Sequence, residues 1–384
     1  MTAVVTMYWL FSMSVGAGAF YYGTLGGNSS FLKFELETTV TTLYFAIFLM
    51  LITAFTLNLG AYCTGKKILQ KKVFPESFRK VLRRYIIYFP FALVPFLFLD
   101  FRPGLLGSSG NFSSFFYWFL TIFSVCLVVT NKKILFVVGG ILFFLLLSVS
   151  AGDRRDVIYC LLISFIIYKN FNGLKGIGLL ITIFLFIALI FSSVIYMSSL
   201  RANSNLSSNL TIGILLANID VIYYYFHGIN SVILAIENLN LLAYGETIIK
   251  PLFILFPREL IGDLKPESML TQYTSIYDPA YRAAGNSYPV NFISELIWNF
   301  YILAPFFSYI FGAVLKVWEI KAWKSIYSRA YLKAGLLFSS WYLILNVFRG
   351  AGIEFFIYGF CFLIIAMCLA KYVSFKGAIN PNGT

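Results

Sequence analysis

Charged side chains are scarce in this chain, and their scarcity decides its class. Of 384 residues only 12% are Asp, Glu, Lys or Arg, about half the share found in soluble globular proteins, while 60% are hydrophobic. A soluble domain of this size could not bury so much apolar surface, because the outside of a globule must be largely wetted. The composition therefore excludes a soluble enzyme and a disordered chain, and it predicts a polytopic membrane protein.

Histidine and cysteine are scarce too. There is one histidine, His227, which excludes a histidine-rich metal site. The five cysteines fall in or beside apolar runs, which argues against a disulfide framework. No phosphate-binding loop or GxGxxG pattern follows a strand, so nothing indicates nucleotide hydrolysis. We expect no cofactor and no resident metal, with a carboxylate-only Mg²⁺ site as the open alternative.

Long apolar runs are what the sequence has in plenty. A helix needs about 20 apolar residues to cross about 30 Å of hydrocarbon, since its backbone polar groups must be satisfied internally. The predicted fold is all-α: one integral membrane domain over 1–384, a helical bundle of about 10 (10–12) transmembrane helices. The predicted spans are 3–22, 40–62, 85–101, 114–130, 134–150, 156–168, 177–198, 291–315, 334–348 and 355–370.

The basic residues predict the orientation of these spans. The loop 63–84 holds eight basic residues against one acid, so it is predicted to be cytoplasmic. Alternation then places 131–133, 169–176, 316–333 and both termini inside. Together with loop 63–84, these inner stretches carry 19 of the 29 Lys and Arg residues. The net charge of +13 thus indicates topology and no nucleic-acid partner.

One long stretch, 199–290, falls on the outer side. Its apolar run Leu210–Ile236 is interrupted by polar residues such as Asp220 and His227. We expect a long outer loop containing short helices in or near the interface. A further pair of spans is the alternative, and it would leave the orientation of the other spans unchanged.

Arginine dominates the few basic residues on the outer side. The outer set, seven arginines and three lysines, is Lys33, Arg102, Arg154, Arg155, Arg201, Lys250, Arg258, Lys265, Arg282 and Arg349. The planar guanidinium binds phosphate bidentately and stays charged in a poorly hydrated site. Pairing with nearby acids, or contact with lipid headgroups, is the alternative. Arg154 and Arg155 are adjacent in a tight turn between two apolar runs, which favours a diphosphate ligand.

Three further residues are candidates for proton transfer. Glu295 lies just inside the predicted start of a span, where an ionisable group is costly and is a functional candidate. Its alternative role is to pair with an arginine of a neighbouring helix. Asp278 and His227 are the other candidate bases, and for His227 a structural role is the alternative.

Three stretches resemble the Wzy-type oligosaccharide repeat-unit polymerases, or O-antigen polymerases, of bacterial surface-polysaccharide pathways. They are the turn SAGDRRD at 150–156, the stretch YGETIIKPLFILFPRELIGDLKP at 244–266, and GNSYPVNFISELIWNFY at 285–301. Members of this family show a small-residue and arginine turn, then Pro-Arg followed by Lys-Pro, then Glu leading to Asn and an aromatic. The order and spacing of the three stretches carry the resemblance.

The resemblance implies an activity at the periplasmic face of the bacterial inner membrane. Such polymerases move a growing glycan from undecaprenyl diphosphate to the non-reducing end of a lipid-linked repeat unit, without nucleotide. An O-antigen ligase and a lipid-linked oligosaccharide flippase are the alternatives. A chain-length regulator and a flippase of the same pathway are the implied protein partners.

The resemblance and the chemistry together give a candidate site. The candidate catalytic residues are Glu295, Arg282, Arg258, Asp278 and His227, and the candidate diphosphate-binding residues are Arg154, Arg155, Arg201, Lys250, Lys265 and Arg349. Cations would stabilise the leaving diphosphate, and a carboxylate would accept the proton of the acceptor hydroxyl. The outer tyrosines Tyr273, Tyr277 and Tyr281 could stack on sugar faces, with loop packing as their alternative role.

Overall fold

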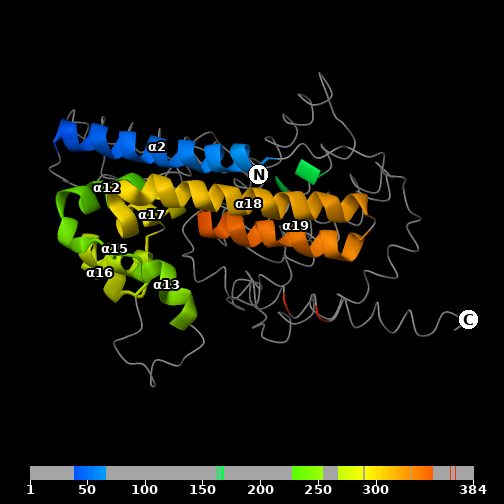
Figure 1. Ribbon diagram of the computed structural model, residues 1–384. Helices are drawn as coiled ribbons and strands as arrows, with labels where there is room; N and C mark the ends of the chain where they lie inside the picture. The colour runs from blue at the N-terminus through cyan, green and yellow to red at the C-terminus, as the bar shows by residue number, and fades with distance from the viewer. Residues whose placement is uncertain are drawn as a thin grey trace, which may run out of the picture. The chain divides into compact units, whose positions relative to one another are not determined.

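The computed structural model describes residues 39–65, 227–253, 267–288, 290–328 and 330–348, together with 162–163, 166–167, 364 and 368. Within these ranges the chain is helical and contains no strand, which agrees with the predicted all-α class (Figure 1). The elements are α2 (Val40–Thr64), α12 (His227–Glu237), η5 (Leu239–Leu241), α13 (Glu246–Phe253), α15 (Met269–Tyr277), α16 (Pro279–Ala283), α17 (Phe292–Phe300), η7 (Tyr301–Leu303), α18 (Ala304–Tyr327) and α19 (Tyr331–Asn346).

The contacts divide the chain into two compact units. The first comprises Met1–Lys67, Ile219–Glu319 and Leu343–Cys361, and the second comprises Ile68–Asn218, Ile320–Tyr342 and Phe362–Thr384. In the described part of the second unit, the rings of Trp323 and Phe338 meet edge to face at 5.0 Å. The described candidate site residues all belong to the first unit.

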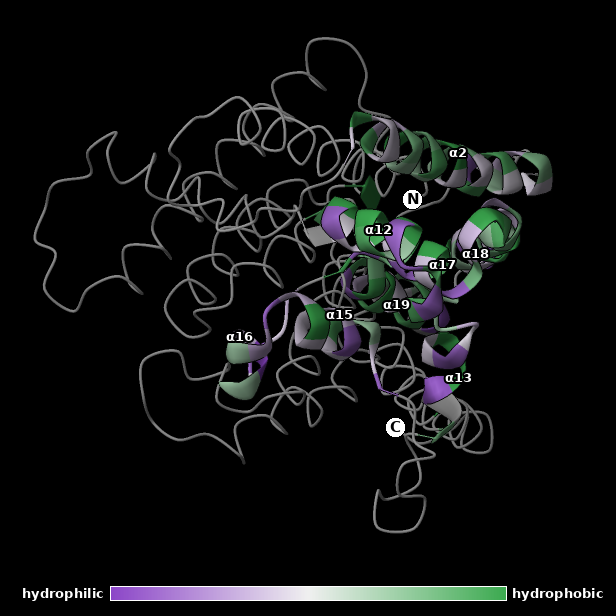
Figure 2. Cartoon of the chain, turned by 90° about the vertical axis from the view of Figure 1, so that its left-hand side faces the viewer, coloured by the Kyte–Doolittle hydropathy of each residue, from purple (hydrophilic) through white to green (hydrophobic). Residues whose placement is uncertain are grey.

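Among the residues that the structure describes, two helical segments are long and apolar enough to cross a membrane. They are α2, with 25 residues, and Phe292–Tyr327, with 36 residues, which joins α17, η7 and α18. Their exposed side chains include many large apolar groups, such as Phe48, Phe55 and Phe306, and Figure 2 colours both segments mostly green. A water-soluble surface avoids such contiguous apolar faces, so these helices indicate a membrane protein.

These two segments run side by side in the same direction (Figure 1). The ring of Phe45 lies 6.4 Å from that of Tyr301, and the Ser308 hydroxyl donates to the Thr53 carbonyl at 2.7 Å. Further along, a Cβ built on Gly312 would overlap the Leu57 carbonyl. Small residues at the crossing let the two backbones approach closely. The predicted topology, with both helices starting on the outer side, requires this parallel direction.

The described helices differ from the predicted spans in where they end. Span 40–62 corresponds to α2, and span 334–348 corresponds to α19, but α18 continues twelve residues past the predicted end at 315. The predicted inner loop 316–333 is therefore mostly helix. Its charges remain compatible with a helix because Lys316 and Glu319 lie one turn apart and form an ion pair of 3.1 Å.

The predicted outer stretch 199–290 contains short helices where it is described. α12 and the following helical stretch to Lys250 are bent by 116° at the break beside η5, and this pair would count as a third span if it is one broken span. Both the predicted interfacial helices and the alternative of further spans thus stay open. Of the other predicted spans, 3–22, 85–101, 114–130, 134–150 and 177–198 lie outside the described residues, as do most of 156–168 and 355–370.

Candidate functional site

Glu295 lies at the centre of a buried polar cluster on α17. The helix begins after Asn291, whose side chain accepts a hydrogen bond from the Ser294 amide at 2.9 Å. Every residue from Phe292 to Asn299 is buried, and Glu295 is only 2% exposed. The hydroxyl of Thr247, from α13, donates to Glu295 Oε1 at 3.0 Å. A buried carboxylate needs such donors, because taking it out of water is costly.

Asn299, one turn after Glu295, ties α13 to α17. Its Nδ2 donates to Thr247 Oγ1 and to the Glu295 carbonyl, both at 2.7 Å, and its Oδ1 accepts from the Gly245 amide at 3.0 Å. Gly245 has a φ of +93° and the preceding Tyr244 a φ of +43°, so the chain turns sharply before α13. Two of the three stretches that carry the family resemblance are therefore joined by hydrogen bonds around one carboxylate.

The start of α12 packs against the start of α17. The Ser294 hydroxyl donates to the carbonyl of Gly228 at 2.8 Å, and a Cβ on Gly228 would overlap the Asn291 amide. A larger residue at position 228 would therefore displace the Asn291 side chain. The preceding His227 begins α12; the position of its side chain lies outside what is described. Gly228, which accepts the bond from Ser294, directly follows His227 in the sequence, and Ser294 directly precedes Glu295. This hydrogen bond therefore joins the residue next to one candidate base to the residue next to the other.

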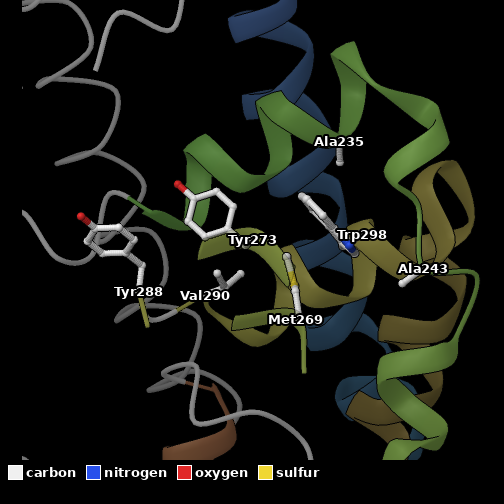
Figure 3. Close-up of a cluster of buried hydrophobic side chains, with 7 residues drawn as sticks. All are labelled: Ala235, Ala243, Met269, Tyr273, Tyr288, Val290 and Trp298. Carbon is white, nitrogen blue, oxygen red and sulfur yellow. The ribbon is translucent and has the colours of Figure 1, made fainter. Parts of the chain in front are cut away.

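An aromatic cluster fixes α15 beside the same helix (Figure 3). The buried members are Ala235, Ala243, Met269, Tyr273, Tyr288, Val290 and Trp298. The rings of Tyr273 and Trp298 meet edge to face at 6.4 Å, so α15 contacts α17 directly beside Asn299. The buried Trp298 Nε1 has no hydrogen-bond partner in the described part of the chain. A buried hydrogen-bond donor without a partner costs about 1–3 kcal/mol. This indole nitrogen lies beside the polar cluster.

Asp278 has a structural role in this arrangement. It is the N-cap of α16, accepting from the Tyr281 amide at 2.9 Å through Oδ1, and its Oδ2 accepts from the Tyr288 hydroxyl at 2.9 Å. The ring of Tyr277 stacks on that of Tyr273 at 5.1 Å, and burial raises the pKa of Tyr277 above its ordinary value. These tyrosines pack on one another, which is the alternative role that the sequence left open.

The two described cations of the candidate site lie on α13 and α16. Lys250 is half-buried and follows Thr247 by one turn on α13, so the two share a helix face. Arg282 is half-buried in the last turn of α16, and no described carboxylate lies within ion-pair distance of it. The remaining candidates lie outside the described residues: Arg154, Arg155, Arg201, Arg258, Lys265 and Arg349.

Sequence reasoning identified Glu295 as a candidate base, with pairing to an arginine of a neighbouring helix as its alternative role. In the structure the Thr247 hydroxyl donates to the Glu295 carboxylate, and Asn299 completes the cluster. Thr247 was not singled out from the sequence, because a threonine in an apolar helix has no distinctive pattern. The only available signal was its place in a stretch that carries the resemblance.

The arrangement combines a carboxylate, a hydroxyl and an amide at the junction of three helices. The Glu295 carboxylate can accept a proton, and the hydrogen bonds of Thr247 and Asn299 can orient this carboxylate. Comparison with protein-family models, with curated proteins and with solved structures finds no match for the chain.

Proposed function

We propose that this protein is a membrane-embedded glycan polymerase that uses lipid-diphosphate-linked oligosaccharides. The observation that carries the proposal is the joining of two resembling stretches, 244–266 and 285–301, around buried Glu295. In this proposal the chain spans the bacterial inner membrane with both termini in the cytoplasm, and the Glu295 cluster faces the periplasm.

The proposed reaction is a displacement at an anomeric carbon. The acceptor hydroxyl of the lipid-linked repeat unit attacks C1 of the growing glycan, and the bond from C1 to the diphosphate oxygen breaks. The hydroxyl proton goes to the Glu295 carboxylate, and undecaprenyl diphosphate leaves with the bonding electron pair. No nucleotide is consumed, because the energy of the reaction is held in the glycosyl diphosphate.

Access to Glu295 requires movement in this scheme. The carboxylate is 2% exposed and covered by Thr247, so an acceptor sugar can reach it only when α13 shifts away from α17. α13 is well suited to such a shift because it follows a bend of 116° and the two positive-φ residues Tyr244 and Gly245. Binding of substrate would then open the site and complete it.

Cations are proposed to stabilise the leaving diphosphate. Lys250, one turn from Thr247, and half-buried Arg282 are the described members of this set. Arg154, Arg155, Arg201, Arg258, Lys265 and Arg349 are the others proposed from the sequence. A preorganised cation aimed at developing charge is worth about 2–4 kcal/mol in such a site.

Complementation of a strain deleted for this chain tests the proposal. Restoration of long surface polysaccharide would be expected from the intact chain, with reduced polymer length from Arg282→Ala at equal expression. A deletion strain that shows single repeat units on its lipopolysaccharide supports a polymerase. A strain that lacks any capping would indicate a ligase, and full-length polymer in the deletion strain would reject both.

A further inference from the structure

The turn before α13 is tied to the end of α17 by two backbone amides. The Ala243 amide donates to the Trp298 carbonyl at 3.0 Å, and the Gly245 amide donates to Asn299 Oδ1 at 3.0 Å. Ala243 and Trp298 also belong to the same buried cluster (Figure 3). The Gly245 amide therefore meets Asn299 from a fixed direction, and a backbone amide can only donate.

The backbone groups around Asn299 leave one orientation for its carboxamide. An amide side chain can be turned over so that its oxygen and nitrogen exchange places. Here the exchange would set Nδ2 against the Gly245 N–H and Oδ1 against the Glu295 carbonyl, which accepts from Nδ2 at 2.7 Å. Two donors would then face each other on one side and two acceptors on the other, although Asn299 is only 2% exposed. Nδ2 is therefore the atom that meets Thr247.

This orientation determines where the proton of the Thr247 hydroxyl goes. Asn299 Nδ2 donates to Thr247 Oγ1 at 2.7 Å, so this oxygen already acts as an acceptor. Thr247 is buried, and among the described residues its hydroxyl has one other hydrogen-bond partner, Glu295 Oε1, at 3.0 Å. A hydroxyl has a single proton to donate. The Thr247 hydroxyl therefore donates to Oε1, which is held as an acceptor without a proton.

We propose that Asn299 is a positioning residue that sets the direction of this hydrogen-bond chain and keeps a lone pair of Glu295 Oε1 facing Thr247. The chain runs from the Gly245 amide through Asn299 and Thr247 to the carboxylate, and neighbouring bonds in such a chain strengthen one another. The inference rests on the proposed function for its catalytic consequence. An acceptor hydroxyl that replaces Thr247 when α13 shifts would meet a lone pair that is ready to take its proton.

Asn299→Asp separates the direction of the chain from the attachment of α13. The two side chains have the same shape, and an ionised aspartate still accepts from the backbone amide of the turn. It has no hydrogen to donate, so we expect the Thr247 hydroxyl to turn and donate to it, and Glu295 loses this bond. Asn299→Ala, which adds no buried charge, is the second variant. Asn58 is the matched control, because its Nδ2 donates to the Ala54 carbonyl of its own helix at 2.9 Å.

Infrared spectroscopy of the full chain in phosphatidylcholine vesicles observes the Glu295 carboxylate without requiring catalysis. Isotopic labelling of the glutamate carboxyl groups, with subtraction of the Glu295→Gln spectrum, isolates its band. We expect Thr247→Val and Asn299→Asp to shift this band equally, and the double variant to add no further shift. Asn299→Ala should shift it in the same direction, and Asn58→Ala should leave it in place. Additive shifts in the double variant, or a wild-type band in Asn299→Ala, would overturn the inference.

Kinetics of polymer formation supply the second readout. Asn299→Asp should lower kcat about tenfold with KM for the lipid-linked repeat unit unchanged, since a hydrogen bond to a buried carboxylate is lost. Thr247→Val in that background should lower kcat no further, and Asn58→Ala should change neither constant. The expected band shifts in a protein that forms no polymer would reject the proposed function and leave the role of Asn299 standing. Polymer formation with a wild-type kcat in Asn299→Asp would do the reverse.

Discussion

Substitution of Gly312 by alanine tests the close packing of α2 against α18. In an isolated helix Gly312→Ala would stabilise by about 1 kcal/mol through helix propensity. In the structure the new Cβ overlaps the Leu57 carbonyl, which is a backbone atom and cannot rotate away. Overpacking of this kind costs about 1–3 kcal/mol. The two effects have opposite signs, so the sign of the measured change decides whether the helices are this close.

The net expectation for Gly312→Ala is a loss of about 0–2 kcal/mol in the free energy of unfolding, measured by reversible unfolding in mixed detergent micelles. Val314→Ala on the exposed face should stay within about 0.5 kcal/mol. Gly60 meets the Tyr309 backbone at the same crossing, so the double variant with Gly60→Ala should cost less than the sum, because one separation relieves both overlaps. A gain of stability for Gly312→Ala would refute the packing.

Three further outcomes are expected in α13, α15 and α16. Thr247→Val removes the hydroxyl that donates to Glu295, so it should cost about 1–3 kcal/mol of stability and shorten the polymer, while Thr247→Ser should restore both. Asp278→Ala should cost about 1 kcal/mol through the lost N-cap, seen in thermal unfolding, with polymer length preserved by the capping variant Asp278→Asn; shortened polymer from Asp278→Asn would instead make this carboxylate functional. Because burial raises the pKa of Tyr277, the unfolded state loses this proton first, so stability should fall as pH rises above about 10. Tyr277→Phe should weaken that fall in an unfolding series against pH, and an unchanged slope would contradict the assignment.

Hydropathy predicted the positions of the two long apolar helices better than the residues at which they end. The predicted span 40–62 differs from α2 by two residues at the C-terminal end. The predicted end at 315 was twelve residues short, because hydropathy detects where the apolar run stops and not where helical hydrogen bonding stops. Lys316 and Glu319 end the apolar run while supporting the helix as an ion pair. The break at Tyr301 had no signal either, since tyrosine favours no positive φ.

The sequence predicted the charged residue of the candidate site, Glu295, but it did not predict the neutral Thr247 that donates to it. Glu295 stood out because an ionisable group near a span is costly. Thr247 is 48 residues away in the sequence, and its contact with Glu295 depends on the bend before α13. Asp278 was a further candidate base, behind Glu295, and in the structure it caps a short helix and accepts from Tyr288. Long-range hydrogen bonds of this kind depend on tertiary packing, which residue type alone does not encode.

Polymer formation by the purified chain, with Glu295 replaced by its uncharged isostere, is the most direct test of the proposed function. Reconstituted wild-type protein should convert undecaprenyl-diphosphate-linked repeat units into longer glycans without nucleotide. Glu295→Gln should reduce kcat by about 10²–10⁴-fold, as expected for loss of a general base. The exposed Glu246→Gln on α13 should retain wild-type activity. Wild-type polymer lengths and rates from Glu295→Gln would contradict the proposal.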